Sequence, residues 1–324
     1  MEPILKVQDL HTEIQTDYGT FEAVSGVSFE LEKGETLGLV GESGCGKSLT
    51  SLSITGLLGP KVRVAGGQAM FEGRDILHLP EKEKRALRGG EIAMIFQEPM
   101  TALNPLFTIG NQMVEMMLPH MKITKKEAME RAVKLLSDMG IERPERIIKS
   151  YPFQLSGGML QRVMIAMSLS CNPKILIADE PTTALDVTIQ AQILKLMNEL
   201  KEKYDTSIIL ITHNLGVVAQ VCDRVAVMYF GKIVETASVK ELFERPLHPY
   251  TRGLMGCIPK LDRDEALLNT IPGMVPAVTE QPKGCSFAPR CPQCMDRCLR
   301  EEPELTKITA GHGCRCFYVQ EGGR

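Results

Sequence analysis

The order of apolar and polar residues along the chain predicts a fold that mixes strands and helices. Apolar and polar positions alternate through residues 1–35, which is typical of strands in an antiparallel sheet. Continuous apolar runs predict buried strands at 35–40, 174–180 and 207–212. Between about 109 and 136 the apolar residues instead recur at helical spacing. Together these patterns indicate an α/β protein with an antiparallel β portion and a helical insertion.

A glycine-rich loop joins the first buried strand to a predicted helix over 47–58. Its sequence, GESGCGKS, matches the phosphate-loop pattern G-x-x-x-x-G-K-[ST] at every fixed position. Glycines let the backbone wrap around a polyphosphate, Lys47 is expected to reach the β- and γ-phosphates, and Ser48 to bind Mg²⁺. An ordinary glycine turn is disfavoured by the complete match. The residues assigned to the nucleotide are Gly41, Glu42, Ser43, Gly44, Cys45, Gly46, Lys47 and Ser48.

Polar residues at the ends of the other strands suggest where the chemistry occurs. The strand over 174–180 ends in Asp179 and Glu180, which fits an acid that binds Mg²⁺ followed by one that orients or deprotonates the attacking water. His213 follows the strand over 207–212 and is expected to hydrogen-bond the γ-phosphate. Ser156, in Leu-Ser-Gly-Gly, can cap a helix whose first N–H groups bind an anion. Solvated strand ends and a common loop composition are the alternatives.

Composition narrows the class of protein and indicates the cellular compartment in which it works. The net charge of −3 gives no general reason to expect nucleic-acid binding. We find neither an apolar run long enough to span a bilayer nor a signal peptide, which predicts a cytoplasmic chain. Thiols are reduced there, so a cysteine-rich segment suggests metal or cluster chemistry more than disulfides. Six of the ten cysteines crowd the C-terminal region: Cys285, Cys291, Cys294, Cys298, Cys314 and Cys316.

In order and spacing, the motifs together resemble the ATPase subunits of ABC transporters, over roughly residues 1–240. The resemblance implies that Tyr18 stacks on adenine, although the residues alone leave a turn tyrosine packed on its own sheet equally open. It further implies that two subunits form a head-to-tail dimer, in which Ser156 and Gly158 meet ATP bound to the partner. The family pattern assigns its remaining nucleotide or Mg²⁺ contacts to Gln97, Gln161, Asp179 and Asp186, and its catalytic roles to Lys47, Gln97, Glu180 and His213.

The C-terminal segment resembles the extension of oligopeptide and dipeptide importer ATPases. Its motifs are PLHPYT at 246–251, IPGMVP at 271–276 and GCSFAPRCP at 284–292. The resemblance implies ATP-driven uptake of peptides through two transmembrane permease subunits, with an extracytoplasmic peptide-binding protein and a second ATPase subunit, self or paralogue. The subunit is then peripheral, at the cytoplasmic face of the membrane. A nickel or other small-solute importer is the alternative in this class, and a soluble ABC ATPase of DNA repair or translation is one outside it.

The cysteines admit two ligand sets. Spacing alone favours Cys291 and Cys294 as half of a zinc site. The family resemblance instead implies that Cys285, Cys291, Cys298 and Cys316 hold a [4Fe–4S] cluster, with Cys294 and Cys314 as extra residues. We favour the cluster over zinc. A redox-sensing role for the segment is a further hypothesis.

The expected architecture is therefore a RecA-like P-loop NTPase core with an antiparallel β subdomain, a helical ABC subdomain and a Cys-rich extension. The predicted domains are 1–240, with the helical subdomain at about 99–165, and 241–324. Because residues 1–240 hold every residue given a catalytic role, we expect the ATPase activity of the isolated subunit largely to survive loss of the cluster.

Overall fold

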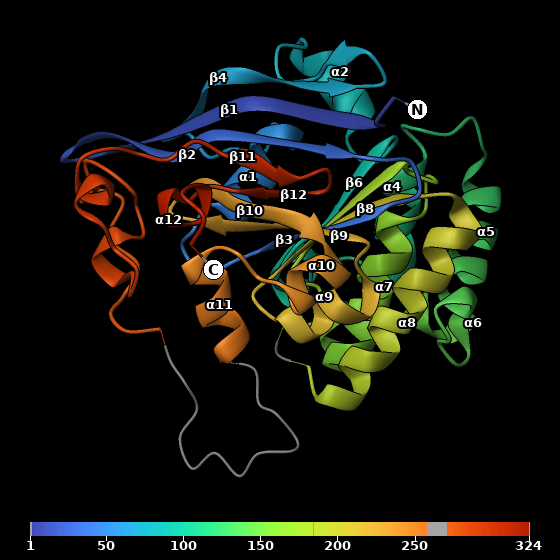
Figure 1. The fold of residues 1–324 in the computed structure, drawn as a ribbon. Helices are drawn as coiled ribbons and strands as arrows, with labels where there is room; N and C mark the ends of the chain where they lie inside the picture. The colour runs from blue at the N-terminus through green and yellow to red at the C-terminus, as the bar shows by residue number, and fades with distance from the viewer. Residues whose placement is uncertain (1, 184, 258–270, 324) are drawn as a thin grey trace. The chain divides into compact units, whose positions relative to one another are not determined.

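The structure is a computed structural model that describes residues 2–183, 185–257 and 271–323. The chain forms two compact units. Unit 1 contains the residues up to His78 and those from Ile211 onward, and unit 2 is Leu79–Leu210. Figure 1 shows the helices and strands with the labels used below.

The N-terminal part of unit 1 is an antiparallel sheet in the order β2-β1-β4-β5. Alternation of polar and apolar residues over 1–35 predicts β1 and β2, but as shorter strands than the structure contains. Residue pairing runs from Leu5 opposite Leu31 to Thr16 opposite Gly19 at the hairpin. Thr12 and Ser53 share a buried 2.7 Å hydrogen bond that ties the sheet to α1. The elements are β1 (Leu5–Thr16), β2 (Gly19–Leu31), α1 (Lys47–Thr55), β4 (Val62–Phe71) and β5 (Arg74–Asp75).

The second sheet of unit 1 contains strands from both ends of the chain. Within the unit the strand order is β11-β12-β10-β9-β3, with β3 parallel to β9. Glu235 of β10 lies opposite Cys314 of β12, so the C-terminal segment extends the sheet (Figure 1). The strands are β3 (Thr36–Val40), β9 (Arg224–Tyr229), β10 (Lys232–Ser238), β11 (Thr306–Thr309) and β12 (His312–Cys314).

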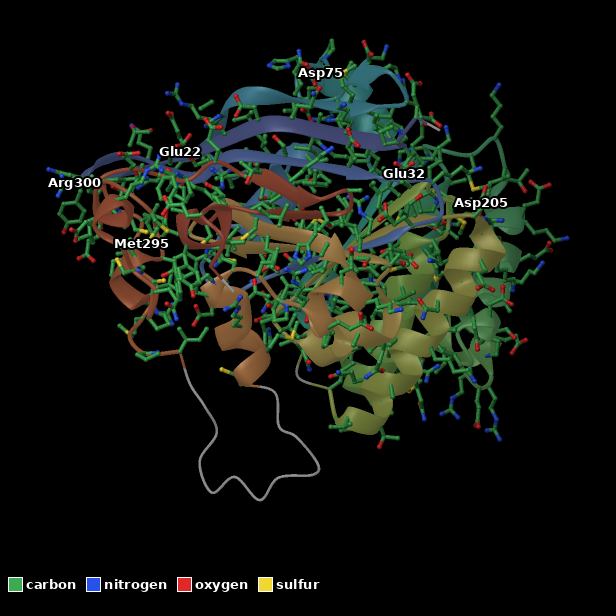
Figure 2. All side chains as sticks on the ribbon, viewed as in Figure 1. Glu22, Glu32, Asp75, Asp205, Met295 and Arg300 are labelled. Atoms are coloured by element: carbon green, nitrogen blue, oxygen red, sulfur yellow. The ribbon has the colours of Figure 1, made fainter. Side chains whose placement is uncertain are left out.

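One hydrophobic core joins this sheet to the C-terminal segment. The rings of Tyr229, Tyr250 and Phe287 pack together, with centroids 4.7 to 5.4 Å apart. Met295, which is labelled in Figure 2, packs against a smaller cluster that contains Cys298. The segment therefore shares the apolar interior of unit 1. The helices of unit 1 that follow β8 are α9 (Leu215–Val221), α10 (Val239–Glu244), α11 (Pro249–Gly256), η2 (Ala288–Arg290), η3 (Asp296–Leu299) and α12 (Phe317–Gln320).

A buried carboxylate strengthens this junction. Glu235 is fully buried and accepts hydrogen bonds from the backbone N–H groups of Leu247 and His248, at 2.7 and 2.8 Å. Its Oε1 also lies 2.6 Å from Nε2 of His312 on β12. Burial lowers the pKa of His248 to about 4, so this imidazole is neutral at physiological pH. Several partners thus satisfy the buried acid, as its burial requires.

Unit 2 combines the strands β8-β7-β6, of which β6 and β7 are parallel, with the helical segment, and β8 continues past Leu210 into unit 1. Thr124 and Glu127 form a capping box at the start of α5. Pro99–Ala102 forms a helical turn in which proline takes the first position. The elements are α2 (Glu81–Leu87), β6 (Ile92–Ile95), α3 (Pro99–Ala102), α4 (Ile109–Met117), α5 (Lys125–Asp138), α6 (Pro144–Ile147), η1 (Pro152–Gln154), α7 (Gly157–Ser168), β7 (Ile175–Asp179), α8 (Val187–Tyr204) and β8 (Ser207–Thr212).

The predicted domain boundaries stay predictions. The compact unit that contains the helical segment extends on both sides of 99–165, and residues on both sides of position 240 belong to unit 1. Among the described residues, no helix has the length and apolar character needed to span a bilayer.

Candidate nucleotide site

The glycine-rich loop lies between buried strand β3 and helix α1, as predicted. Two of its glycines have tight surroundings. Gly46 has φ +98°, and an added Cβ there would lie 2.8 Å from the Ala23 carbonyl oxygen. A Cβ on Gly41 would lie 2.2 Å from the Met228 carbonyl oxygen. Side chains at these positions would push the loop off the strands beneath it, so glycine is required.

Lys47 closes the loop from inside. Its side chain is buried, and Nζ donates to the carbonyl oxygens of Gly41 at 2.8 Å and Glu42 at 2.9 Å. The thiol of Cys45 is buried beside it, with Sγ 3.7 Å from Nζ. Burial raises the pKa of this thiol, so Cys45 stays protonated and adds no charge next to the ammonium. The loop therefore carries a fixed cation among backbone N–H groups, which suits a polyphosphate.

Two other predicted residues of unit 1 lie at exposed positions. Tyr18 lies at the tip of the β1–β2 hairpin, and 88% of its surface is exposed. It does not pack on its own sheet, so the alternative of a packed turn tyrosine is wrong and the ring is accessible to a base. His213 follows β8 directly and is also exposed.

In unit 2 the structure brings Gln97 and Glu180 together. Nε2 of Gln97 donates to Oε2 of Glu180 at 3.3 Å, and the Thr183 hydroxyl donates to the same oxygen at 2.8 Å. Glu180 has φ +47°, a left-handed conformation rare for a residue with a side chain. Such strain is concentrated at functional sites. Asp179, one residue earlier, is buried at the end of β7.

The sequence analysis assigned no role to Thr183. Its position three residues after Glu180 was visible in the sequence, but the hydrogen bond depends on the turn that the chain makes after β7. Ala184, between Thr183 and the predicted contact residue Asp186, lies outside the described residues.

The Ser-Gly-Gly segment begins α7, as predicted. Ser156 is the N-cap, and its Oγ accepts a hydrogen bond from the Met159 N–H at 3.4 Å. An added Cβ at Gly158 would lie 3.3 Å from Ile189 on α8, which favours glycine there. Asp186 caps α8 through a 2.9 Å hydrogen bond from the Ile189 N–H. The side chain of Gln161 is 2% exposed, and among the described residues its Nε2 has no hydrogen-bond partner.

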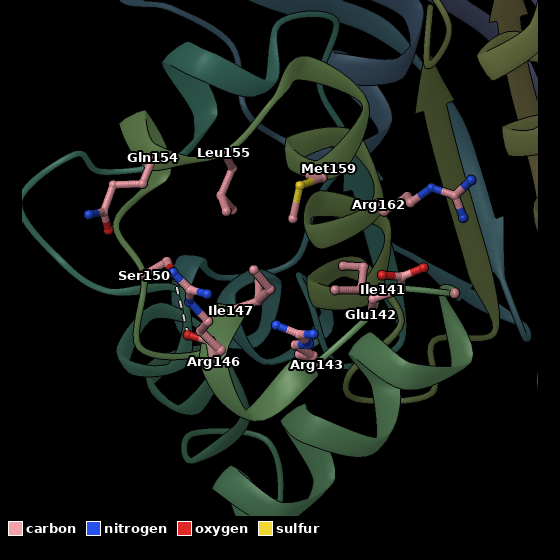
Figure 3. Close-up of a pocket in the computed structure, with 11 residues that line it drawn as sticks. Ile141, Glu142, Arg143, Arg146, Ile147, Ser150, Gln154, Leu155, Met159 and Arg162 are labelled. Atoms are coloured by element: carbon pink, nitrogen blue, oxygen red, sulfur yellow. Dashed lines mark hydrogen bonds between the residues drawn. The ribbon is translucent and has the colours of Figure 1, made fainter.

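A separate pocket of about 690 Å³ opens in unit 2 (Figure 3). Arg143, Arg146 and Arg162 contribute to its wall, and Arg162 donates to the Met139 carbonyl oxygen at 2.5 Å. None of its lining residues is among those assigned to nucleotide, Mg²⁺ or cluster binding. Leu155 and Met159 also line it, however, and they are next in sequence to the assigned residues Ser156 and Gly158.

Solved structures with this architecture are ATP-binding cassettes. A dimeric post-hydrolysis state of the cassette MJ0796 bound to ADP and Pi has a TM-score of 0.66 and 26% identity to this chain. That match covers 72% of this chain and 98% of MJ0796. The class of the protein is thus that of the ABC ATPases, and the chain is an ATPase.

Sequence relatives specify the family. Residues 24–183 match the family model "ABC transporter", and residues 234–298 match "Oligopeptide/dipeptide transporter, C-terminal region". The chain is 53% identical to the oligopeptide transport ATP-binding protein AppD of Bacillus subtilis, over 100% of this chain and 99% of AppD. It is 54% identical to the dipeptide transport ATP-binding protein DppD of the same organism, over 98% and 95%. The chain belongs to the family of ATP-binding subunits of oligopeptide and dipeptide ABC transporters.

Proposed function

We propose that this ATPase drives uptake of oligopeptides or dipeptides through separate permease subunits at the cytoplasmic face of a membrane. The observation that carries the proposal is similarity along the whole chain to peptide transport ATP-binding proteins, including the C-terminal region. The relatives reported above are named for peptides, which favours peptide over nickel as cargo. A peptide-binding protein outside the membrane completes the proposed transporter.

Transport by the assembled complex tests this proposal. We expect copurified permease subunits, reconstituted with this chain in vesicles, to take up labelled di- or oligopeptides only with ATP. Nickel, added in a parallel experiment, should not be transported. Uptake of nickel without uptake of peptide would contradict the proposed cargo.

Within the site, each residue has a proposed role. The N–H groups of loop 41–48 and the Lys47 ammonium bind the β- and γ-phosphates, and Tyr18 stacks on adenine. Ser48, Gln97 and Asp179 offer the oxygen ligands that Mg²⁺ prefers, and the ion, when bound, neutralises charge on the phosphate oxygens. Glu180 orients the attacking water and takes its proton, while His213 contacts the γ-phosphate. The Gln97 and Thr183 hydrogen bonds hold the Glu180 carboxylate in one orientation.

The proposed dimer gives Ser156 a role in trans. We expect Ser156→Arg to abolish ATP hydrolysis, because a long cation replaces the exposed cap that faces the partner's nucleotide. Mixing this variant with a Lys47→Ala chain should restore activity, since one of the two composite sites of the mixed dimer then lacks both changes. Full hydrolysis by a dimer of Ser156→Arg chains alone would argue against the head-to-tail arrangement.

We further propose that the extension holds a [4Fe–4S] cluster through four of its cysteines. Cys285, Cys291, Cys298 and Cys316 line one pocket, whereas Cys294 is exposed and Cys314 does not line it. Burial raises the pKa of Cys285 to about 11 and that of Cys291 to about 12, so ligation must displace protons. Among the described residues, no group of three or more side chains stands in a metal-binding arrangement. The proposal therefore rests on the cysteine thiols as iron ligands and on the one pocket that all four cysteines line.

Iron and sulfide analysis tests the cluster. We expect anaerobically purified protein to be brown, with about four iron atoms and four acid-labile sulfides per chain. Cys298→Ser should bleach the protein, whereas Cys294→Ser, the matched control in the same segment, should not. Colourless protein with one zinc ion per chain that is lost on Cys294→Ser would support the zinc site instead.

A further inference from the structure

Arg290, in the C-terminal segment, lies against the glycine-rich loop. Only 4% of its side chain is exposed, and Nη1 and Nη2 donate to the two carboxylate oxygens of Glu42 at 2.7 and 3.1 Å. Nε donates to the Pro272 carbonyl oxygen at 2.9 Å. This bidentate pairing raises the pKa of Arg290, so the guanidinium is charged at every working pH. A buried cation thus connects two segments 248 positions apart in the sequence.

All three polar groups of Glu42 are occupied in this arrangement. Its carboxylate pairs with Arg290, its backbone N–H donates to the Tyr250 hydroxyl at 2.8 Å, and its carbonyl oxygen accepts from Lys47 at 2.9 Å. Tyr250 is itself fully buried in the aromatic cluster with Tyr229 and Phe287. Two partners of Glu42, Arg290 and Tyr250, therefore come from beyond residue 240.

These contacts bear on phosphate binding because the loop acts through the directions of its backbone N–H groups. Glu42 is the second residue of the loop. The next two residues, Ser43 and Gly44, are exposed and form a turn. Fixing Glu42 limits the conformations that the exposed part of the loop can adopt, and this lowers the entropy lost when a polyphosphate binds.

We propose that Arg290 is a positioning residue for ATP: it holds Glu42 and thereby keeps the phosphate-binding loop in its binding conformation. The proposal rests on the proposed assignment of residues 41–48 to the phosphates. It gives the extension a part in ATP binding, although residues 1–240 hold every residue given a catalytic role. Arg290 immediately precedes Cys291, so the order of the cysteine-rich segment bears directly on this contact.

The test compares ATP binding and turnover by full-length variants. Arg290→Met removes the cation but keeps much of the apolar stem, and we expect the KM for ATP to rise about tenfold with kcat within about twofold, as for an interaction equal in ground and transition states. Arg290→Lys keeps the charge and loses the bidentate geometry, so it should recover part of the affinity. Arg297→Met is the matched control. Arg297 lies in the same segment, stacks 3.9 Å over the Phe317 ring and pairs with Glu301, away from the loop.

Double substitution separates positioning from general destabilisation. Glu42→Gln should raise the KM as Arg290→Met does, and the double variant should be no worse than the poorer single variant, because both changes break one interaction. The proposal would be overturned if the KM increases of the two single variants multiplied in the double variant. An equal rise in the KM of Arg297→Met would also overturn it. If Arg290→Met does not fold, Arg290→Lys and Glu42→Gln carry the same comparison. If both of these variants have a normal KM while Lys47→Ala no longer binds ATP, the role of Arg290 is refuted and the loop assignment stands. Normal ATP binding by Lys47→Ala would refute the loop assignment itself.

Discussion

We expect Glu180→Gln to lower the rate of ATP hydrolysis by at least a hundredfold, because general-base catalysis typically contributes that much. ATP binding should be retained. The amide keeps the shape of the side chain and an oxygen that still accepts from Thr183, but it cannot take a proton from water. Single-turnover hydrolysis and equilibrium binding of labelled ATP measure the two effects separately. The closed dimer should accumulate with unhydrolysed nucleotide.

Glu199→Gln is the control for this experiment. Glu199 is also a glutamate of unit 2, and its ion pair with Lys195 at 3.8 Å is solvent-exposed on α8. Its loss should leave hydrolysis unchanged, since exposed pairs of this kind contribute little. If Glu180→Gln hydrolysed ATP at the parental rate, another group would have to be the base.

Lys47→Ala is expected to weaken ATP binding by about a hundredfold, because it removes charge-assisted hydrogen bonds to the phosphates. It also removes the contacts to Gly41 and Glu42 that close the loop. Lys47→Met keeps the apolar stem in its buried position and should bind ATP as weakly, which separates the charge from packing. Titration with a fluorescent ATP analogue provides the measurement.

Lys61→Ala should bind ATP normally, because Lys61 is exposed in the same unit and its nearest carboxylate, on Asp17, is 3.9 Å away. Equal loss of affinity in the Lys61 and Lys47 variants would indicate a nonspecific effect of charge. Unchanged affinity in Lys47→Ala would contradict the phosphate-loop assignment.

Local patterns in the sequence predict much of the fold. Continuous apolar runs correctly indicate the buried strands over 36–40, 175–179 and 207–212, because strands covered on both faces need apolar residues throughout. Ser156 caps α7 as its residue type and position predict. The loop motif is likewise local, so strand, loop and helix are evident within about twenty residues.

The features that the sequence analysis missed depend on distant parts of the chain or on backbone conformation. The pairing of Arg290 with Glu42, and of β12 with β10, involves segments that carry no shared pattern. A left-handed residue is easy to anticipate at glycine, but Glu180 adopts this conformation only because its surroundings impose it. The core of unit 1 includes residues on both sides of position 240, such as Tyr229 and Phe287, and no local pattern indicates that they meet.

The composition of unit 1 has a consequence for synthesis of the protein on the ribosome. Its N-terminal sheet and glycine-rich loop emerge first, but strand β12 and the Phe287 ring, which complete its core, are among the last parts translated. Unit 2 lies wholly between them in the sequence, so it is translated before the core of unit 1 can be completed. A message truncated after codon 240 would therefore produce a chain with an uncovered β10 edge and an exposed apolar surface, which favours aggregation and recognition by chaperones or proteases.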